Sequence, residues 1–478
     1  MYDSPERSAG RKERLKLGRI PYPEREPWER VRDFYEVVLG YDVDMAMAEA
    51  SRCMQCPQPA ACAQACPLHN DIPLAMWLIS QGELIEAANV YRQTSIFPEI
   101  CGRVCPQERL CEGACVLERR YWAPSLGKLE MFVADYQRTN EGWPRGEVAP
   151  PTGKKVAVVG AGPAGMAVAE KLARLGHAVT VYEAAPYPGG LLLYGIPNFK
   201  LPKSLVIDKV EYLKSLGITF VCNTRIGKNL TIDKLFESGF HAVFVGVGAN
   251  VDAKLKAPGV ELKGIYQAGE FLVRNSPPPE LVPADYQGMI DVGERVAVIG
   301  GGDTATDCLR TSLRLGAKDV VCYYRRTEAE MPGSRRERQH AIEEGVRIEY
   351  LVAPTRFIGD EAGRLRAMEL QRMQLGDLDK SGRPRPVPMP GSEFTVPVDT
   401  VILALGYWPD ETIVKTTPEL KTHDWGLITA DQATGRTSRP GVYAGGDDVT
   451  GPDLVVTAVA AAFRAATAMH DYLMALDS

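Results

Sequence analysis

The chain has 478 residues, 45% of them hydrophobic and 24% charged, a composition typical of a globular protein that divides into two to four domains. Its formal net charge of -6 gives no long-range attraction to nucleic acid or to an anionic membrane surface, so we expect a protein or small-molecule partner. No segment reaches the ~20 uninterrupted apolar residues of a bilayer span and no secretory apolar stretch opens the chain, so we expect a cytoplasmic protein without a membrane span.

The N-terminal part combines a proline-rich arm with a helical segment. Residues 1–27 contain four prolines among many charges and are expected to form an extended arm. The sequence then becomes helical in character and rich in cysteine, until a linker over residues 143–153 brings three more prolines. We therefore predict a small α-helical domain over residues 1–150 that begins with the arm.

Most of the cysteines gather in this domain at short spacings. A secreted disulfide framework would need an export signal, so thiolate ligands of a metal site are the better interpretation. A proline follows at least one cysteine of each run, as in the ligand runs of 4Fe-4S proteins. Zinc sites with four cysteines usually pair two CxxC knuckles, and only one occurs here. We predict iron-sulfur clusters, with zinc as the alternative, among Cys53, Cys56, Cys62, Cys66, Cys101, Cys105, Cys111 and Cys115.

A strand–glycine–helix unit follows, KKVAVVGAGPAGMAVAEKLARLG, with a second strand AVTVYE. Its glycines permit a tight turn and the close approach of the backbone to a pyrophosphate, while the helix N-terminus faces the phosphate charge. An acid ends the second strand, where a carboxylate can accept hydrogen bonds from ribose hydroxyls. We therefore predict a dinucleotide site at Gly160, Gly162, Gly165 and Glu183.

The unit recurs as ERVAVIGGGDTATDCLRTSLRLG with the strand DVVCYY, and this repeat predicts a second dinucleotide site. Its second strand ends in two arginines instead of an acid. Guanidinium groups can bind a 2′-phosphate that an acid would repel, which favours NADPH over NADH. A solvated strand end is the alternative. The residues expected at NADPH are Gly300, Gly302, Asp303, Thr304, Arg325 and Arg326, with Arg335 and Arg336 as weaker candidates.

Near the C-terminus, TSRPGVYAGGD reads as a short strand that ends in Gly446 and Asp447 before an apolar helix. It resembles the second FAD signature of flavoproteins with two dinucleotide domains. The resemblance implies that the first site holds FAD and that Asp447 contacts its ribityl or pyrophosphate part. Because no CxxC lies near either unit, disulfide reduction lacks its thiol pair, and the clusters are the expected exit for electrons.

These units predict an α/β fold with two Rossmann-like domains, one inserted in the other, behind the helical iron-sulfur domain. Apolar strands over residues 242–247 and 400–405 each lead into glycine, where the chain is expected to pass between domains. We expect an FAD-binding domain made of residues 151–285 and 400–478, and an NADPH-binding domain over residues 286–399.

After the cysteine runs, the motifs GAGPAG, PGGLLLYGIPNFKLPK, GGGDTATDC, MPGSRRE and AGGD follow in this order. The chain thereby resembles the glutamate synthase small (beta) subunit family from about residue 30 to its end. It is also similar to the large subunit of the NADH-dependent ferredoxin:NADP oxidoreductase and to the N-terminal part of dihydropyrimidine dehydrogenase. The resemblance implies FAD, NADPH and two 4Fe-4S clusters as cofactors, with Gly190 of the second motif at the FAD.

The same resemblance implies crossed ligation of the two clusters. Cluster 1 is assigned four thiols, and one loop between them has five residues where the family pattern has four. Cluster 2 is assigned three thiols and a helix carboxylate, whose other interpretation is an exposed side chain. The sets are Cys53, Cys56, Cys62 and Cys115 for cluster 1, and Cys66, Cys105, Cys111 and Glu130 for cluster 2, with Cys101 as its alternative ligand.

We expect hydride transfer from NADPH to FAD, which needs orientation more than an acid–base residue, so no catalytic residue is predicted. Electrons then pass through the clusters to a partner in a hetero-oligomer. The resemblance favours the large (alpha) subunit of glutamate synthase, which makes L-glutamate from 2-oxoglutarate and glutamine. The alternatives are a ferredoxin:NADP oxidoreductase or bifurcating subunit with a ferredoxin-like acceptor and, in another class, a zinc-stabilised binding module without catalytic activity.

Overall fold

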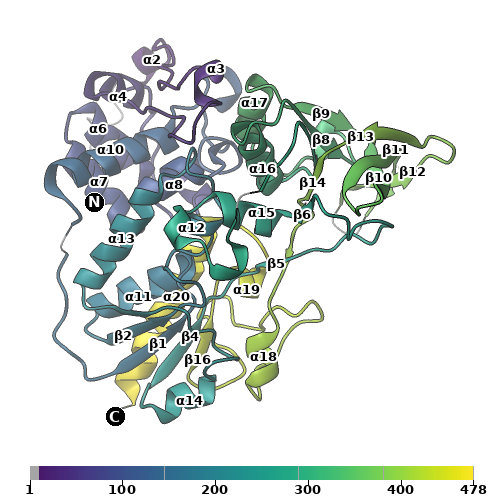
Figure 1. Cartoon of the computed structure of the whole chain (residues 1–478). Helices are drawn as coiled ribbons and strands as arrows, with labels where there is room; N and C mark the ends of the chain where they lie inside the picture. The colour runs from purple at the N-terminus through teal and green to yellow at the C-terminus, as the bar shows by residue number, and fades with distance from the viewer. Residues whose placement is uncertain (1–9, 145, 289, 380–381, 477–478) are drawn as a thin grey trace.

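The computed structural model describes residues 10–144, 146–288, 290–379 and 382–476, so the first nine residues of the predicted arm lie outside the described part. Figure 1 shows an N-terminal group of helices beside two α/β units. Each unit is built on a five-stranded parallel sheet. The predicted α/β class, with two Rossmann-like domains behind a helical domain, is confirmed.

The first sheet has the strand order β16-β4-β1-β2-β3. Its central strands are short apolar runs that are buried on both faces, as parallel strands covered by helices require. Helices α11 and α20 pack against each other on one side of it. The strands are β1 (Lys155–Val159), β2 (Ala178–Tyr182), β3 (Thr219–Val221), β4 (Ala242–Val245) and β16 (Val442–Ala444). The helices are α11 (Pro163–Arg174), α12 (Leu191–Tyr194), α13 (Lys203–Ser215), α14 (Ile232–Glu237), α18 (Thr412–Thr416), α19 (Asp447–Thr450) and α20 (Val455–Ala475).

The second sheet has the order β6-β14-β7-β8-β9, and an antiparallel sheet of β10 to β13 extends beside it. The parallel strands are β6 (Ile265–Gln267), β7 (Arg295–Ile299), β8 (Asp319–Tyr324), β9 (Arg347–Tyr350) and β14 (Thr400–Leu403). The antiparallel strands are β10 (Val352–Gly359), β11 (Leu365–Leu378), β12 (Pro384–Pro388) and β13 (Phe394–Pro397). The helices are α15 (Ala268–Asn275), α16 (Asp303–Arg314) and α17 (Arg335–Glu343), with 3-10 turns at Pro279–Leu281, Ala284–Tyr286 and Glu328–Glu330.

The chain passes between the two units through a two-stranded ribbon of β5 (Val251–Asp252) and β15 (Tyr407–Trp408). The second sheet therefore includes strands that lie outside the residue range 286–399 expected for the second domain. Strands β6 and β14 pair with each other and complete the second sheet, although β6 precedes residue 286 and β14 follows residue 399. The strands alone could not show this, because a parallel sheet takes its neighbours from distant parts of the chain.

The N-terminal domain is helical, as predicted. Its core helices pack in pairs, with α10 against α7 and α8. The arm is not uniformly extended, because Arg11–Arg14 form the short helix α2. Farther along, Glu24 forms an antiparallel β-bridge with Val38. The helices are α2 (Arg11–Arg14), α3 (Pro27–Arg30), α4 (Val43–Ala50), α5 (Ala61–Ala65), α6 (Ile72–Ser80), α7 (Leu84–Arg92), α8 (Pro98–Val104), α9 (Glu118–Tyr121) and α10 (Leu126–Glu141), with a 3-10 turn at Gln107–Arg109. Within the described ranges, every helix falls short of the length or apolarity needed to cross a bilayer.

A buried charge cluster around Glu344 joins the three parts of the chain. Its carboxylate pairs with Arg30 of the N-terminal domain at 2.9 Å and with Arg310 and Arg314 of α16, each at 2.7 Å. The ring of Phe199 lies below both α16 guanidinium groups, 4.6 Å from that of Arg310 and 4.0 Å from that of Arg314. The three parts therefore share one electrostatic contact from which water is excluded.

Replacing Glu344 by Gln is expected to lower the free energy of unfolding by about 3–5 kcal/mol, because buried guanidinium groups lose their compensating charge. Burial disfavours the ionised carboxylate, but Arg310 and Arg314 outweigh this effect and lower the pKa of Glu344 from 4.5 to about 2. The difference from wild type is therefore fully present above about pH 4.5 and shrinks as the pH falls towards 2. Urea unfolding followed by tryptophan fluorescence measures it.

The matched control is Glu237→Gln, which removes an exposed carboxylate that pairs with Lys234. This variant should unfold at the wild-type urea concentration. Equal effects of the two substitutions would show that the buried cluster does not hold the domains together.

Candidate functional site

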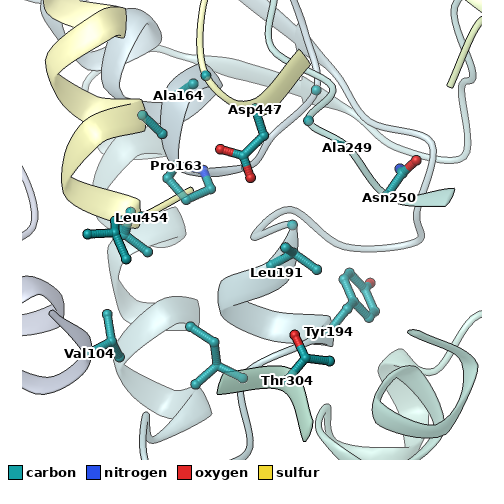
Figure 2. A pocket seen from close by; sticks show the side chains of 18 of the residues that line it. Val104, Pro163, Ala164, Leu191, Tyr194, Ala249, Asn250, Thr304, Asp447 and Leu454 are labelled. Atoms are coloured by element: carbon teal, nitrogen blue, oxygen red, sulfur yellow. The ribbon is translucent and has the colours of Figure 1, made fainter. Parts of the chain in front are cut away.

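A cavity of about 700 Å³ lies where the two sheets and the N-terminal domain meet. Its walls include the first glycine fingerprint, the start of α16 and residues 104–106 of the N-terminal domain. In Figure 2, Leu191 and Tyr194 of α12 lie opposite Thr304 of α16, and Val104 borders the same space. The cavity therefore connects both predicted dinucleotide sites with the cysteine-rich domain.

The first fingerprint makes a tight turn between β1 and α11. Gly160 has a φ of 95°, and a Cβ at this position would lie 2.5 Å from the carbonyl oxygen of Gly246. A Cβ at Gly165 would collide with the carbonyl oxygen of Gly160, whereas one at Gly162 would have no neighbour within 4 Å. The backbone thus leaves open space in front of the first turn of α11, which fits a pyrophosphate.

Glu183 lies directly after β2 on the wall of this cavity. Its two carboxylate oxygens accept hydrogen bonds from the backbone N–H groups of Ala161 and Ala185, each at 2.8 Å. Burial raises the pKa of Glu183 despite these backbone donors. Further donors would favour the ionised form, and the hydroxyls of a ribose could supply them.

The remaining predicted FAD residues lie around the same turn. Gly190 has a φ of 52°, and a Cβ there would lie 2.7 Å from the Cα of Gly162. Gly446 has a φ of 101° before α19, and the Asp447 carboxylate points into the cavity (Figure 2). Burial raises the pKa of Asp447 to about 6. A polar group of a bound cofactor is the kind of partner that would offset this burial.

Sequence analysis did not assign the next residue, Asp448, which is buried. Its Oδ2 accepts a hydrogen bond from the N–H of Val247 at 3.1 Å, and its carbonyl oxygen accepts one from the N–H of Ile428 at 2.8 Å. The side chain therefore fixes α19 against the end of β4, beside Asp447. The second acid of GGDDVTG was the sequence signal that could have indicated it.

The second fingerprint forms the equivalent turn between β7 and α16. A Cβ at Gly300 would collide with the carbonyl oxygen of Ala404, whereas one at Gly302 would meet open space. The Asp303 carboxylate accepts a hydrogen bond from the N–H of Ser334 at 2.9 Å, so it fixes the start of α17. Thr304 faces the cavity (Figure 2). The backbone geometry fits a second dinucleotide, while Asp303 has a structural contact of its own.

The two arginines after β8 differ in their surroundings. Arg326 is buried, and its guanidinium donates to the carbonyl oxygen of Pro384 and to Asp379, each at 2.8 Å. Arg325 is exposed. Partial burial and the neighbouring Arg326 charge lower the pKa of Arg325. This concentration of positive charge fits an anionic phosphate, with Arg325 as the accessible group and Arg326 anchored to the antiparallel sheet.

The two weaker candidates at the start of α17 also separate. Arg336 points to the N-terminal domain, where it pairs with Glu112 at 3.6 Å and lies 5.1 Å from the ring centroid of Tyr22. The Arg335 side chain is exposed, and its backbone N–H donates to Glu108 at 2.9 Å. Arg336 therefore binds the N-terminal domain to α17.

Four thiols surround a small cavity in the N-terminal domain. Its lining includes all four members of the set predicted for cluster 1, namely Cys53, Cys56, Cys62 and Cys115. Burial chiefly, together with the nearby thiols, raises the pKa values of Cys53 and Cys62 to about 12. Thiolates would require a compensating cation here. Among the described residues, no three His, Cys, Asp or Glu side chains converge closely enough for a single metal ion.

The residues predicted for cluster 2 lie within electrostatic reach of Glu130, and so does Cys101. Burial chiefly, with smaller contributions from nearby carboxylates that include Glu130, raises the pKa values of Cys66 and Cys111, and Glu130 acts in the same direction on Cys105 and Cys101. Glu130 is not an exposed helix carboxylate: it is buried, and its Oε1 has no hydrogen-bond partner. Cys101 forms a thiol hydrogen bond with Cys105. A buried carboxylate oxygen without a hydrogen-bond partner beside these thiols fits a cluster with mixed ligands, and Cys101 stays the alternative ligand.

Cys105 also connects the two regions, because Val104, Cys105 and Pro106 line the large cavity. Of the residues predicted for cluster 2, Cys105 borders the space beside the fingerprints, whereas the four thiols predicted for cluster 1 lie around a separate cavity.

Two family models match the chain. Residues 30–142 match the dihydropyrimidine dehydrogenase domain II, 4Fe-4S cluster, and residues 154–462 match the pyridine nucleotide-disulphide oxidoreductases. The prediction of a 4Fe-4S domain, in place of structural zinc, is confirmed. The second match covers more than half of the chain and spans both sheets.

Curated relatives extend over almost the whole chain. The glutamate synthase [NADPH] small chain of Escherichia coli is 40% identical, over 96% of this chain and 98% of that protein. The oxidoreductase AegA of E. coli is 43% identical, over 93% of this chain and 68% of that protein. Among solved structures, FprA of Mycobacterium tuberculosis in complex with NADPH is 23% identical, with a TM-score of 0.56, and covers 69% of this chain and 86% of its own.

We predict that Glu183→Ala and Asp447→Ala each lower the fraction of protein that carries FAD, while the iron content stays near the wild-type value. Glu183→Ala also leaves the N–H groups of Ala161 and Ala185 without their acceptor, a loss of ~1–3 kcal/mol. Flavin absorbance and colorimetric iron analysis of the same preparations measure the two contents. Loss of iron in step with flavin would show that these carboxylates support the whole fold.

Proposed function

The chain belongs to the family of glutamate synthase small chains and pyridine nucleotide-disulphide oxidoreductases, and we propose that it delivers electrons from NADPH to the large subunit of a glutamate synthase. It is an NAD(P)H-dependent oxidoreductase with FAD and 4Fe-4S cofactors. The observation that carries the proposal is the cavity bordered by both dinucleotide sites and by Cys105. Donor, flavin and cluster positions thereby adjoin one another.

FAD, when bound, accepts a hydride and can return its two electrons singly. In our assignment, Gly160, Gly162 and the N-terminus of α11 bind its pyrophosphate, and Gly165 permits the close packing of α11 on β1. Glu183 accepts hydrogen bonds from the ribose. Gly190 and Gly446 let the surrounding loops approach without side chains. Asp447 contacts the ribityl or pyrophosphate part: its carboxylate accepts a hydrogen bond from a ribityl hydroxyl, or its protonated form donates one to a pyrophosphate oxygen.

NADPH is assigned to the second fingerprint. Gly300 and Gly302 allow the backbone to approach the pyrophosphate at the start of α16, and Thr304 faces the space shared with the flavin site. Arg325 binds the 2′-phosphate, and Arg326 holds the strand end in place through Asp379. The apolar side chains of the wall limit the access of water to the donor and acceptor. The two binding sites orient the nucleotides, so the transfer needs no acid–base residue.

Two clusters would be held in the N-terminal domain by the crossed sets. Support comes from the cavity lined by the four thiols of cluster 1 and from the buried Oε1 of Glu130, which has no hydrogen-bond partner and lies beside the thiols of cluster 2. The Cys101 thiol, which hydrogen-bonds Cys105, is assigned as a neighbour of the ligands and not as one of them.

The acceptor is tested by reconstitution. The holoprotein is mixed anaerobically with purified glutamate synthase large subunit, and glutamate formation from 2-oxoglutarate and glutamine is followed with NADPH. Turnover that requires both chains supports the proposed hetero-oligomer. Absence of turnover, together with NADPH-dependent reduction of a ferredoxin, would replace it with the ferredoxin:NADP oxidoreductase alternative.

Arg325→Ala is predicted to raise the Michaelis constant for NADPH about tenfold while changing that for NADH little, because one charge-assisted contact of ~1.5–3 kcal/mol to the 2′-phosphate is lost. Steady-state reduction of a dye by each nucleotide measures the effect. Arg120→Ala removes an exposed arginine of the N-terminal domain and is the control that should leave both constants unchanged. Equal changes for NADPH and NADH would argue against a 2′-phosphate contact.

Cys105→Ala is predicted to disrupt cluster 2 and to block electron delivery to the partner, while NADPH still bleaches the flavin. Cys101→Ala should have a much smaller effect, and Glu130→Ala should change the redox signal of cluster 2. Anaerobic spectroscopy with NADPH, followed by electron paramagnetic resonance of the reduced clusters, separates these outcomes. If Cys101→Ala abolished the cluster and Glu130→Ala left its signal unaltered, the ligand set would be four cysteines.

A further inference from the structure

The conversion of hydride into single electrons leaves a proton behind in the large cavity. NADPH gives up a hydride, which is one proton together with two electrons. Iron-sulfur clusters accept the electrons and no hydrogen, so each oxidised NADPH leaves one proton that must pass to solvent. Hydride transfer itself needs no acid–base residue, whereas the release of this proton needs an acceptor.

Asp307 and Lys200 form an ion pair between the two dinucleotide sites. Asp307 is on α16, one turn after Thr304, and Lys200 lies between α12 and α13 of the first α/β unit. Both residues line the large cavity. Their side chains are nearly buried, and Nζ of Lys200 lies 2.7 Å from Oδ1 of Asp307. A carboxylate and an ammonium group are therefore available where both nucleotides are assigned.

The ion pair continues through α17, which packs beside α16 (Figure 1), to the N-terminal arm. Nζ of Lys200 lies 3.7 Å from Oε2 of Glu337. Oε1 of Glu337 lies 3.9 Å from Nδ1 of His340, whose Nε2 lies 3.2 Å from Oε2 of Glu24. The two longer gaps become hydrogen bonds after small rotations of the flexible side chains. A continuous row of titratable groups thus leads from the cavity wall to the arm.

His340 is suited to pass a proton along this row. The ring is buried, while the side chain of Glu24 beyond it is 25% exposed. Within the described ranges of the chain, Nδ1 of His340 has no hydrogen-bond partner. An imidazole can take up a proton at one ring nitrogen and release another from the second. The row therefore ends in a relay between α17 and a partly exposed carboxylate.

Asp307 is suited to take up the proton at the other end. Burial raises its pKa to about 6, Glu337 and Asp303 add to this effect, and Lys200 opposes it. The carboxylate is thus ionised at neutral pH, with a pKa close to the working pH, as a general base requires. The other titratable or charged groups around it are Lys203, Cys308, Arg310 and Tyr407.

We propose that Asp307 takes up the proton that each NADPH leaves behind, and that the row through His340 to Glu24 carries it to solvent. The inference deepens the proposed function, because only the splitting of hydride into electrons produces this proton. Lys200, Glu337 and His340 each gain a proton on one side and give one up on the other. Every group thus ends as it began, and one proton reaches solvent for each two electrons that enter the clusters.

The test follows one oxidation of the holoprotein after anaerobic reduction with one equivalent of NADPH. The protein is mixed with ferricyanide, which accepts single electrons, in weakly buffered solution with phenol red. Stopped-flow absorbance then records flavin re-oxidation and proton release separately. Asp307→Asn is expected to slow both by about a hundredfold, the low end of the range for a positioned acid–base group. The rate at which NADPH bleaches the flavin should change little, and Asp307→Glu should restore most of the lost rate.

The pH profile separates proton uptake from a structural role of Asp307. Wild-type re-oxidation should slow as the pH falls below about 6, because a protonated Asp307 accepts no further proton. Asp307→Asn should lack this decline. Infrared titration of the oxidised protein, without turnover, should show a carboxyl group that protonates in the same range in wild type and is missing in Asp307→Asn.

A second variant and a control complete the experiment. His340→Gln keeps a polar side chain beside Glu24 but offers no second ring nitrogen, so proton release should slow here too. Asp319→Asn is the matched control: it breaks an ion pair with Arg347 of 2.6 Å, in which the aspartate side chain is 46% exposed, and should match wild type. Flavin content, iron content and melting temperature report the folding of each variant.

The proposal is overturned if Asp307→Asn releases protons at the wild-type rate, since water in the cavity would then carry them. Equal slowing in Asp319→Asn, or bleaching by NADPH that slows as much as re-oxidation, overturns it as well. If Asp307→Asn does not fold, His340→Gln decides: slowed release supports the path, and wild-type release overturns it. Failure of the proposed function looks different, because NADPH would then leave the flavin of the wild-type protein oxidised.

Discussion

The docking of the three domains depends on the buried carboxylate of Glu344. It is enclosed by Arg30 from the N-terminal domain and by Arg310 and Arg314 from α16, with Phe199 of the first α/β unit below. A guanidinium left unpaired in such a place costs several kcal/mol, ~3–5 by comparison with other buried pairs. The domains can therefore satisfy these charges only in one mutual arrangement. The ion pairs of Glu344 therefore fix the positions of the domains that form the walls of the large cavity.

The same arrangement brings the loop of cluster 2 to the nucleotide fingerprint. Glu108 lies between Cys105 and Cys111 in the sequence. Its carboxylate accepts hydrogen bonds from the hydroxyl of Ser334 at 2.8 Å and from the backbone N–H of Arg335 at 2.9 Å. The N–H of Ser334 donates in turn to Asp303 at the start of α16. Two short links therefore connect the proposed cluster ligands with the second dinucleotide site. A core of two dinucleotide domains alone would have no such connection, so the N-terminal domain helps to shape the second dinucleotide site.

Sequence spacing predicted the features that depend on neighbours along the chain. Both glycine fingerprints lie between the expected strand and helix, and Glu183 follows β2 as expected. The grouping of the thiols came from the family resemblance and not from spacing. The four thiols predicted for cluster 1 line one cavity, and the set for cluster 2 stays a prediction. Contacts across long separations left no periodic signal. Strand β6 pairs with β14, although the whole second fingerprint lies between them in the sequence. Arg326 donates a hydrogen bond to Asp379, which lies 53 positions later. Local pattern thus predicted the cofactor sites, whereas the sheet membership of β6 and β14 and the contacts of each arginine required the fold.

The buried carboxylates separate into two kinds by the direction of their pKa shift. At Glu344 and Glu337 burial opposes ionisation, but paired cations outweigh it and lower the pKa. At Glu183, Asp447 and Glu130 burial prevails and the pKa is raised. A protein gains no stability from a buried carboxylate without a cation or sufficient donors. The first kind therefore holds the domains together, whereas the second kind lies where FAD and an iron-sulfur cluster would provide the missing partners. A raised pKa alone does not mark a cofactor contact, because the pKa values of Glu112, Asp307 and Asp448 are raised as well and these carboxylates contact protein groups. Glu183, Asp447 and Glu130 are proposed for cofactors because they also lie on the cavity wall or beside the thiols.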